Sequence, residues 1–442
     1  MRSKIFYIAI LTVFLASTVC FLPKNTCAVQ NEVCITFVFQ DKQFVYDQSK
    51  ISFDSQNSDV VKSLQKRGFF EDNKQKAKIA NQVISLGFDE VTATKYVLAG
   101  IDKTFDKICN QIEKQKQDSQ IIFDTSKQNP FETTQHNHGL SVDKNLLCKN
   151  LLKKLKTNDV FKLKIPVTKI EAVTKENNQK NTQLKSYFST DCKNSSQNRK
   201  DNLALALSKF DGMVILPGQV VSFNDVVGKR VEENGFKKAK VISYGKYVDG
   251  IGGGVCQAST TLYNAVLLAG LRVDEWHRHT LKSNYVEPSF DAMVNDNGAD
   301  FVFSNNTKHK VFVKAKCDGQ KAMVWLYGSP NQFEYKTKSV TEKTTRANEQ
   351  VLVDEKGDYA DKVEFDDESF CLQNPVDGVT SKGYLVATKN GKTVWQKLLR
   401  TDNYATVDKI VIKGAKNRFE DLQKSSMKTH DDTICQAEKT KF

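Results

Sequence analysis

A single cysteine stands at the start of an apolar segment that two histidines follow. The segment, GIGGGVCQASTTLYNAVLLAG over 250–270, has four glycines ahead of Cys256. Glycine permits a sharp turn and a close approach of the backbone, and the apolar spacing after it predicts a buried helix over 257–269 that ends at Gly270. The dipole of such a helix favours the thiolate form of a cysteine at its N-terminus. These features make Cys256 a candidate nucleophile.

The residues after this helix provide a candidate base. Glu275, His277 and His279 alternate along EWHRHT, so an extended chain places them on one face. About 14 helical residues advance roughly 21 Å, and about seven extended residues return roughly 23 Å, so His277 or His279 can lie beside Cys256. Glu275, or another acid, would orient that imidazole. Thiol acyl transfer or amide hydrolysis is the chemistry expected, with an oxyanion stabilised by the N–H groups from Gly253 to Cys256.

Binding without turnover is an alternative for the same segment. Backbone N–H groups of the glycine loop can hold a carboxylate or phosphate, and nearby polar side chains can add contacts. The candidate contact residues are Gly252, Gly253, Gly254, Gln257, Arg230 and Tyr263. Buried cysteine is often only a small apolar residue, and Tyr263 fits core packing better than substrate contact. Replacement of Cys256 by serine or alanine separates the hypotheses, because only a binding role tolerates it.

A metal site is the third hypothesis. Cys256, His277 and His279 are ligand types that zinc accepts, but the sequence offers no evident fourth ligand. The ten cysteines contain no Cys-x-x-Cys pair, and their spacing does not indicate which of them form disulfides. We therefore predict neither a metal nor another cofactor. Asp291 is interpreted as a turn residue rather than as a catalytic acid.

The start of the chain predicts an exported protein, and its charge bears on the partners expected. One long apolar stretch, Ile5 to Leu22, follows Arg2 and Lys4, so residues 1–28 are predicted to be a signal peptide or an N-terminal membrane anchor. The formal charge of +13 fits attraction to anionic surfaces such as lipid headgroups or wall polymers, and the alternative, which the sequence favours, is a solvated lysine-rich surface. Nucleic acid is not an expected partner, because the chain is exported and has no arginine–aromatic stripe.

Hydrophobic periodicity predicts a multidomain α+β protein. Amphipathic helices are expected over 59–68, 73–86, 90–109 and 143–155, and a hairpin over 384–395 turns at Asn390-Gly391. The predicted boundaries are the leader over 1–28, a mixed α/β domain over 30–172, a polar linker over 173–185, a central α+β domain over 186–328, a β-rich module over 335–416 and a charged tail over 417–442.

The central domain resembles the VanW family, which is named after an accessory protein of vancomycin-resistance clusters. The matching motifs, in order, are Asn198-Arg199, LPGQVVSFN over 216–224, Val227-Gly228, Gly235-Phe236, 250–265 and 275–280. Residues 139–147 and 161–167 resemble a peptidoglycan-binding domain, and 390–414 resembles the closing half of a G5 module. The resemblance implies a protein of the cell envelope that acts on or binds peptidoglycan.

Overall fold

The computed structural model describes residues 33–51, 72–157, 160–243 and 246–423. These residues form helices and several separate sheets, which confirms the predicted multidomain α+β class. Within these ranges no helix is both long enough and apolar enough to cross a bilayer.

Three predicted segments fall wholly or largely outside the described residues. They are the leader over 1–28, the helix over 59–68 and the tail over 417–442.

The first compact unit comprises residues 1–120 and 134–175. Its elements are β1 (Cys34–Phe39), β2 (Lys42–Asp47), the 3-10 turn η1 (Gln48–Lys50), α3 (Asn73–Ser85), α4 (Glu90–Val97), α5 (Ile101–Ile112), β5 (Gly139–Val142), α6 (Lys144–Leu155), β6 (Val160–Lys164) and β7 (Val167–Ile170). Strand β1 lies between antiparallel β2 and parallel β6, while β5 pairs with β7. The apolar faces of these strands and helices enclose one core.

The single helix predicted over 90–109 is wrong, because the structure has two helices there. Gly100 adopts a left-handed φ of 74°, which interrupts the helical backbone between α4 and α5. The predictions over 73–86 and 143–155 agree with α3 and α6. Each of these two helices is capped by an aspartate carboxylate that accepts a hydrogen bond from the first turn.

The second unit comprises residues 121–133 and 176–442. Up to residue 328 its elements are β3 (Ile121–Phe123), β4 (Phe131–Thr133), α7 (Lys175–Lys180, which starts at the boundary), β8 (Gln183–Asp191), α8 (Gln197–Ser208), β9 (Val214–Ile215), β10 (Val220–Ser222), α9 (Phe223–Val227), η2 (Glu232–Asn234), β11 (Lys238–Ser243), β12 (Lys246–Ile251), α10 (Val255–Leu268), β13 (Arg272–Glu275), β14 (Val302–Ser304), β15 (Val311–Cys317) and β16 (Lys321–Gly328). The segment expected to be a linker, 173–185, thus contains α7 and the start of β8.

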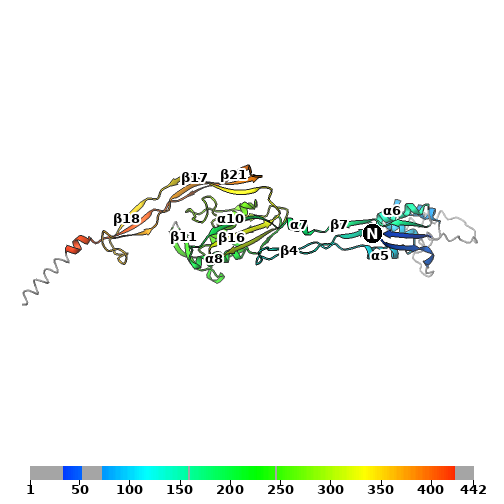
Figure 1. The fold of residues 1–442 in the computed structure, drawn as a ribbon, viewed down its shortest axis with the longest axis horizontal. Coiled ribbons are helices and arrows are strands. Elements are labelled where there is room, and N and C mark those ends of the chain that lie inside the picture. The colour runs from blue at the N-terminus through cyan, green and yellow to red at the C-terminus, as the bar shows by residue number, and fades with distance from the viewer. Residues whose placement is uncertain (1–32, 52–71, 158–159, 244–245, 424–442) are drawn as a thin grey trace, which may run out of the picture. The chain divides into compact units, whose positions relative to one another are not determined.

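Helix α10 is the centre of this unit. It packs against β8 and β16 of a sheet with the order β8-β16-β15-β9, and α8 contacts it as well (Figure 1). Nearly every residue of α10 is buried, as its apolar composition predicts. The hairpin β3–β4 joins this unit through aromatic packing, because the ring of Phe131 lies 5.2 Å from that of Phe312 and 5.1 Å from that of Tyr327.

The remaining strands form two three-stranded sheets. They are β17 (Glu334–Thr345), β18 (Glu349–Asp354), β19 (Ser369–Gln373), β20 (Gly378–Lys389), β21 (Lys392–Tyr404) and β22 (Lys409–Gly414), arranged as β17-β20-β21 and β18-β22-β19 (Figure 1). The predicted turn between β20 and β21 is confirmed, with positive φ at Asn390 and Gly391. Tyr335 of β17 lies directly against Gly270, just beyond α10.

We predict that Cys192 and Cys317 form a disulfide under oxidising conditions. Their sulfurs lie 3.8 Å apart as free thiols, so closing the bond needs little movement. Burial, with Cys317 nearby, raises the pKa of Cys192 to about 12, so the partly exposed Cys317 is the thiol that must react first. Oxidised glutathione should link the pair and raise the free energy of unfolding by about 2–4 kcal/mol.

Non-reducing peptide mapping and urea unfolding measure these two effects. Cys192→Ala should abolish both the cross-link and the gain in stability. A bridge to a different cysteine, or none at all, would contradict the prediction.

Candidate functional site

The loop between β12 and α10 requires glycine at two positions. A Cβ at Gly253 would lie 2.7 Å from the carbonyl oxygen of Lys240, so any side chain there would push against β11. Gly254 has a φ of 111° and would meet the Arg199 carbonyl oxygen at 2.8 Å. Together they let the chain turn directly into α10, where Cys256 is the second residue. In this first turn the backbone N–H groups of Val255 and Gln257 donate to the carbonyl oxygens of Gly252 and Gly254, at 3.1 and 3.0 Å.

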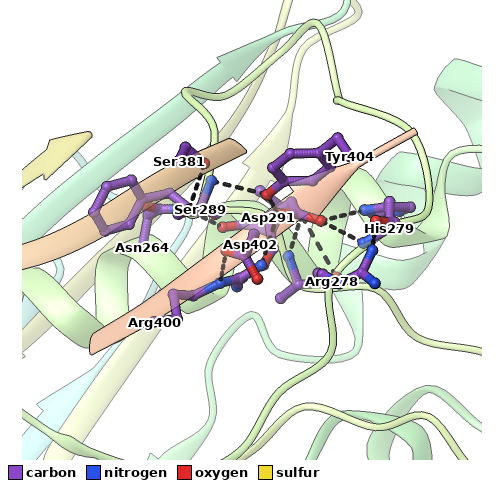
Figure 2. Close-up of polar contacts among 12 residues, drawn as sticks. Asn264, Arg278, His279, Ser289, Asp291, Ser381, Arg400, Asp402 and Tyr404 are labelled. Carbon is purple, nitrogen blue, oxygen red and sulfur yellow. Dashed lines mark hydrogen bonds and ion pairs between the residues drawn. The ribbon is translucent and has the colours of Figure 1, made fainter. Parts of the chain in front are cut away.

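His279, and not His277, is the imidazole that lowers the pKa of the Cys256 thiol, through hydrogen bonding and charge. The Cys256 thiol also lies 3.2 Å from the carbonyl oxygen of Val294, which accepts a hydrogen bond from its protonated form. His279 is only 8% exposed, and its Nδ1 lies 2.7 Å from Oδ2 of Asp291. The same oxygen accepts the backbone N–H of His279 at 2.7 Å, so both the ring and its main chain are fixed (Figure 2). With Nδ1 held in this way, Nε2 is the nitrogen left for the thiol.

The pKa values of Cys256, His279 and Asp291 are all shifted in the direction that favours the charged form. Burial acts to raise the pKa of the Cys256 thiol, but hydrogen bonding and the charge of His279 hold it below its ordinary value. Burial also opposes charge on His279, yet Tyr285, Asp291 and Cys256 hold the pKa of its imidazolium well above its ordinary value. Burial acts to raise the pKa of Asp291, and His279 with Arg400 lowers it to about 2. All three shifts therefore act in the direction of the charged forms, a thiolate, an imidazolium and a carboxylate.

His277 and Glu275 form a separate pair. Nε2 of His277 lies 2.8 Å from Oε1 of Glu275, and their side chains are 41% and 43% exposed. Strand β13 ends at Glu275 after a bulge that starts at Val273, so the alternation expected from 275 to 279 does not continue. His279 consequently turns toward Cys256, and the other two expected members of the site do not.

Asp291, which the sequence-based interpretation assigned to a turn, is the carboxylate that holds His279. It is 1% exposed and lies in the segment PSFDAMV, where Phe290 and Ala292 are also buried. An acidic residue flanked by apolar residues was the available signal, since a buried carboxylate requires paired donors.

A cleft of about 940 Å³ opens beside the thiol. Among the predicted site residues, those that line it are Cys256, His279, Gly252, Gly253, Gly254, Gln257 and Arg230. Tyr263 is 1% exposed and packs edge-on against Phe301, so it is a core residue. His277 and Glu275 are absent from the lining.

The two predicted polar contact residues are already engaged within the fold. Gln257 donates to the carbonyl oxygen of Asp191 at 2.8 Å, and its own oxygen accepts from Arg199 at 3.0 Å. Arg230 pairs with Asp296 and donates to Asn224, and its side chain is 7% exposed. Gln257 therefore positions the wall of the cleft, whereas Arg230 contributes positive charge next to Cys256.

The zinc-type grouping of Cys256 with both histidines does not occur. In the part of the chain that the structure describes, no three His, Cys, Asp or Glu side chains gather as a metal site. The nitrogen of His279 that faces away from Cys256 is occupied by Asp291.

Comparisons with known proteins concern part of the chain. It is 38% identical over 148 residues to "Uncharacterized protein YoaR" of Bacillus subtilis (strain 168), which covers 34% of this chain and 49% of that protein. It is 27% identical over 131 residues to "Vancomycin B-type resistance protein VanW" of Enterococcus faecalis (strain ATCC 700802 / V583), covering 28% and 47%. The chain thus spans about half the length of these relatives.

Two solved structures are also similar. "Crystal structure of HP0197-G5" is 20% identical, covering 19% of this chain and 100% of that one, with a TM-score of 0.12. "IgA1 Protease G5 domain structure" is 17% identical, covering 20% and 93%, with a TM-score of 0.14.

The family match coincides with the site. Residues 198–327 match the family described as "VanW like protein". Cys256, His279 and Asp291 all lie inside this range, as does the glycine loop. The similarity to the VanW family thus extends over the central domain of this chain.

Proposed function

We propose that the central domain is a cysteine acyl-transfer centre that acts on the peptides of peptidoglycan in the cell envelope. The observation that carries the proposal is the buried chain of contacts from Cys256 through His279 to Asp291, at a cleft. The family match supports a cell-wall substrate, and one relative is named for resistance to vancomycin.

The first step forms a thioester. The Cys256 thiolate attacks the carbonyl carbon of a substrate amide, and the carbonyl π electrons move to oxygen. When the tetrahedral intermediate collapses, the C–N bond breaks and the His279 imidazolium gives its proton to the leaving amine. The N–H of Cys256, in the first turn of α10, is the donor proposed for the developing oxyanion.

The second step releases the acyl group. An acceptor amine, or water, attacks the thioester carbon while neutral His279 takes the proton of the attacking group. The C–S bond then breaks and Cys256 leaves as the thiolate. Asp291 stays ionised throughout, so that it orients the ring and stabilises the imidazolium. An amine acceptor gives transpeptidation, and water gives hydrolysis.

The charge of the cleft fits a substrate with free carboxylates. Its lining contains the cations Lys193, Arg199, Arg230, Lys240 and Lys282. The acidic lining residues are Asp191 and Asp296, and the latter is paired with Arg230. A net positive cleft attracts an anionic peptide.

The expected partners of the whole chain follow from the same proposal. The formal charge of +13 favours peptidoglycan or anionic wall polymers, and residues 139–147 and 161–167 resemble part of a peptidoglycan-binding domain. The N-terminal segment would take the chain out of the cytoplasm, and it would hold the chain at the membrane if it is not cleaved.

Alkylation of Cys256 should respond to pH through His279. The pKa of the Cys256 thiol is lowered, so thiolate forms at a pH below the usual thiol pKa of about 8.5. The rate of iodoacetamide labelling should therefore rise with pH to a plateau, with a midpoint below about 8.5. His279→Ala removes the lowering partner and leaves burial, so the midpoint should move up. Mass spectrometry of the Cys256 peptide across a pH series measures it.

His277→Ala is the matched control, because that imidazole is exposed and paired with Glu275. Its midpoint should equal that of the unmodified protein. A shift in His277→Ala but not in His279→Ala would overturn the assignment of the base.

Turnover should depend on the Cys256 thiol. The full chain, incubated with defined muropeptides and an amine acceptor, should give a transferred or hydrolysed product, and Cys256→Ala should lower kcat by at least about 1000-fold. Cys371→Ser, at an exposed thiol of β19, is the control and should keep full activity.

Equal muropeptide binding by the unmodified protein and by Cys256→Ala, with no product from either, would refute turnover. It would leave the cleft as a binding site.

A further inference from the structure

We propose that Arg400 and Tyr404, on β21 of the C-terminal sheet, are positioning residues for the Cys256 site and act through Asp291. The inference rests on the proposed role of Cys256 as a reactive thiolate. Both residues lie outside the matched range 198–327, so the family match does not include them.

Asp291 divides its two oxygens between two parts of the chain. Its Oδ2 accepts from the backbone N–H and Nδ1 of His279, both at 2.7 Å. Its Oδ1 accepts from the Tyr404 hydroxyl at 2.6 Å and from Nη2 of Arg400 at 3.0 Å. Figure 2 shows Asp291 between His279 and the two residues of β21. The orientation of the carboxylate, and hence of the imidazole, is set from β21.

Hydrogen bonds and a ring contact hold the guanidinium of Arg400 in place. Its Nε donates to Asp402 at 2.5 Å, and its Nη1 donates to the backbone carbonyl of Asp291 at 2.6 Å. The guanidinium lies 4.2 Å from the ring centre of Trp276, and the side chain is 1% exposed. A cation this deeply buried would be costly without a defined set of acceptors.

Tyr404 has a fixed proton direction. The backbone N–H of Ser289 donates to its hydroxyl oxygen at 2.8 Å, so the hydroxyl hydrogen is free to point at Asp291. Ser289 also shares a 2.7 Å hydrogen bond with Ser381 of β20. The result is a short chain of hydrogen bonds from Ser289 in the loop to Tyr404 on β21 and from there to the Asp291 carboxylate.

The register of the C-terminal sheet presents these groups together. Residues 400, 402 and 404 alternate along β21 and so share one face. On β20, Gly383 pairs with Arg400. A Cβ at Gly383 would lie 2.9 Å from the carbonyl oxygen of Ser289, so glycine permits the close contact with the site loop.

A double-mutant cycle on the full chain tests whether Tyr404 acts through Asp291. Tyr404→Phe removes one hydroxyl, and the less well-held ring of His279 should slow iodoacetamide labelling of Cys256 at pH 7 on the order of tenfold, the effect of losing a hydrogen bond to a charged group. In an Asp291→Asn background the same change should alter the rate less than about twofold. Tyr384→Phe, elsewhere in the sheet, should leave labelling unchanged.

Thermal melting of each variant shows whether it is folded. If Tyr404→Phe does not fold, Arg400→Lys replaces it in a second cycle with Asp291→Asn. Equal slowing in both backgrounds, or no slowing in the unmodified one, overturns the inference. Labelling needs no substrate, so the coupling between Tyr404 and Asp291 can be measured even if muropeptides yield no product. If product forms but Tyr404 and Asp291 are not coupled, only the positioning role is refuted.

Discussion

The site depends on keeping one carboxylate ionised inside the protein. Asp291 is 1% exposed, and an isolated carboxylate at such a position would cost several kcal/mol. The cost is offset because all the groups around it donate, namely the main chain and ring of His279, the guanidinium of Arg400 and the hydroxyl of Tyr404. Once the carboxylate is fixed, the imidazole is fixed, and hydrogen bonding and charge from His279 in turn lower the pKa of the Cys256 thiol.

This requirement explains why separate parts of the second unit meet at one point. Helix α10 carries the thiol, the loop after β13 carries the imidazole and carboxylate, and β21 carries the compensating donors. Glycine permits the close contacts between these parts, because a side chain at Gly253 would collide with β11 and one at Gly383 would collide with the loop that carries Ser289. The C-terminal sheet is thus part of the electrostatic environment of the thiol.

Local patterns in the sequence predicted the helix that follows the glycine loop well. The glycines, the apolar run and the terminal Gly270 define α10 to within two residues, and Asn390-Gly391 identifies the β20–β21 turn. The choice between His277 and His279 was beyond such patterns, because strand β13 ends at Glu275 and the alternation expected from 275 to 279 does not continue past it. The contact of Asp291 with Arg400 joins residues 109 positions apart and leaves no periodic signal.

The central claim is that Cys256 forms a covalent acyl intermediate. Intact-mass and peptide mass spectrometry of the full chain, quenched in acid during reaction with a defined stem peptide, test it directly. We predict a mass increase equal to the acyl portion of the peptide, located on Cys256, released by hydroxylamine and absent from Cys256→Ala. An unmodified Cys256 during demonstrable turnover, or an acyl group on another residue, would contradict it.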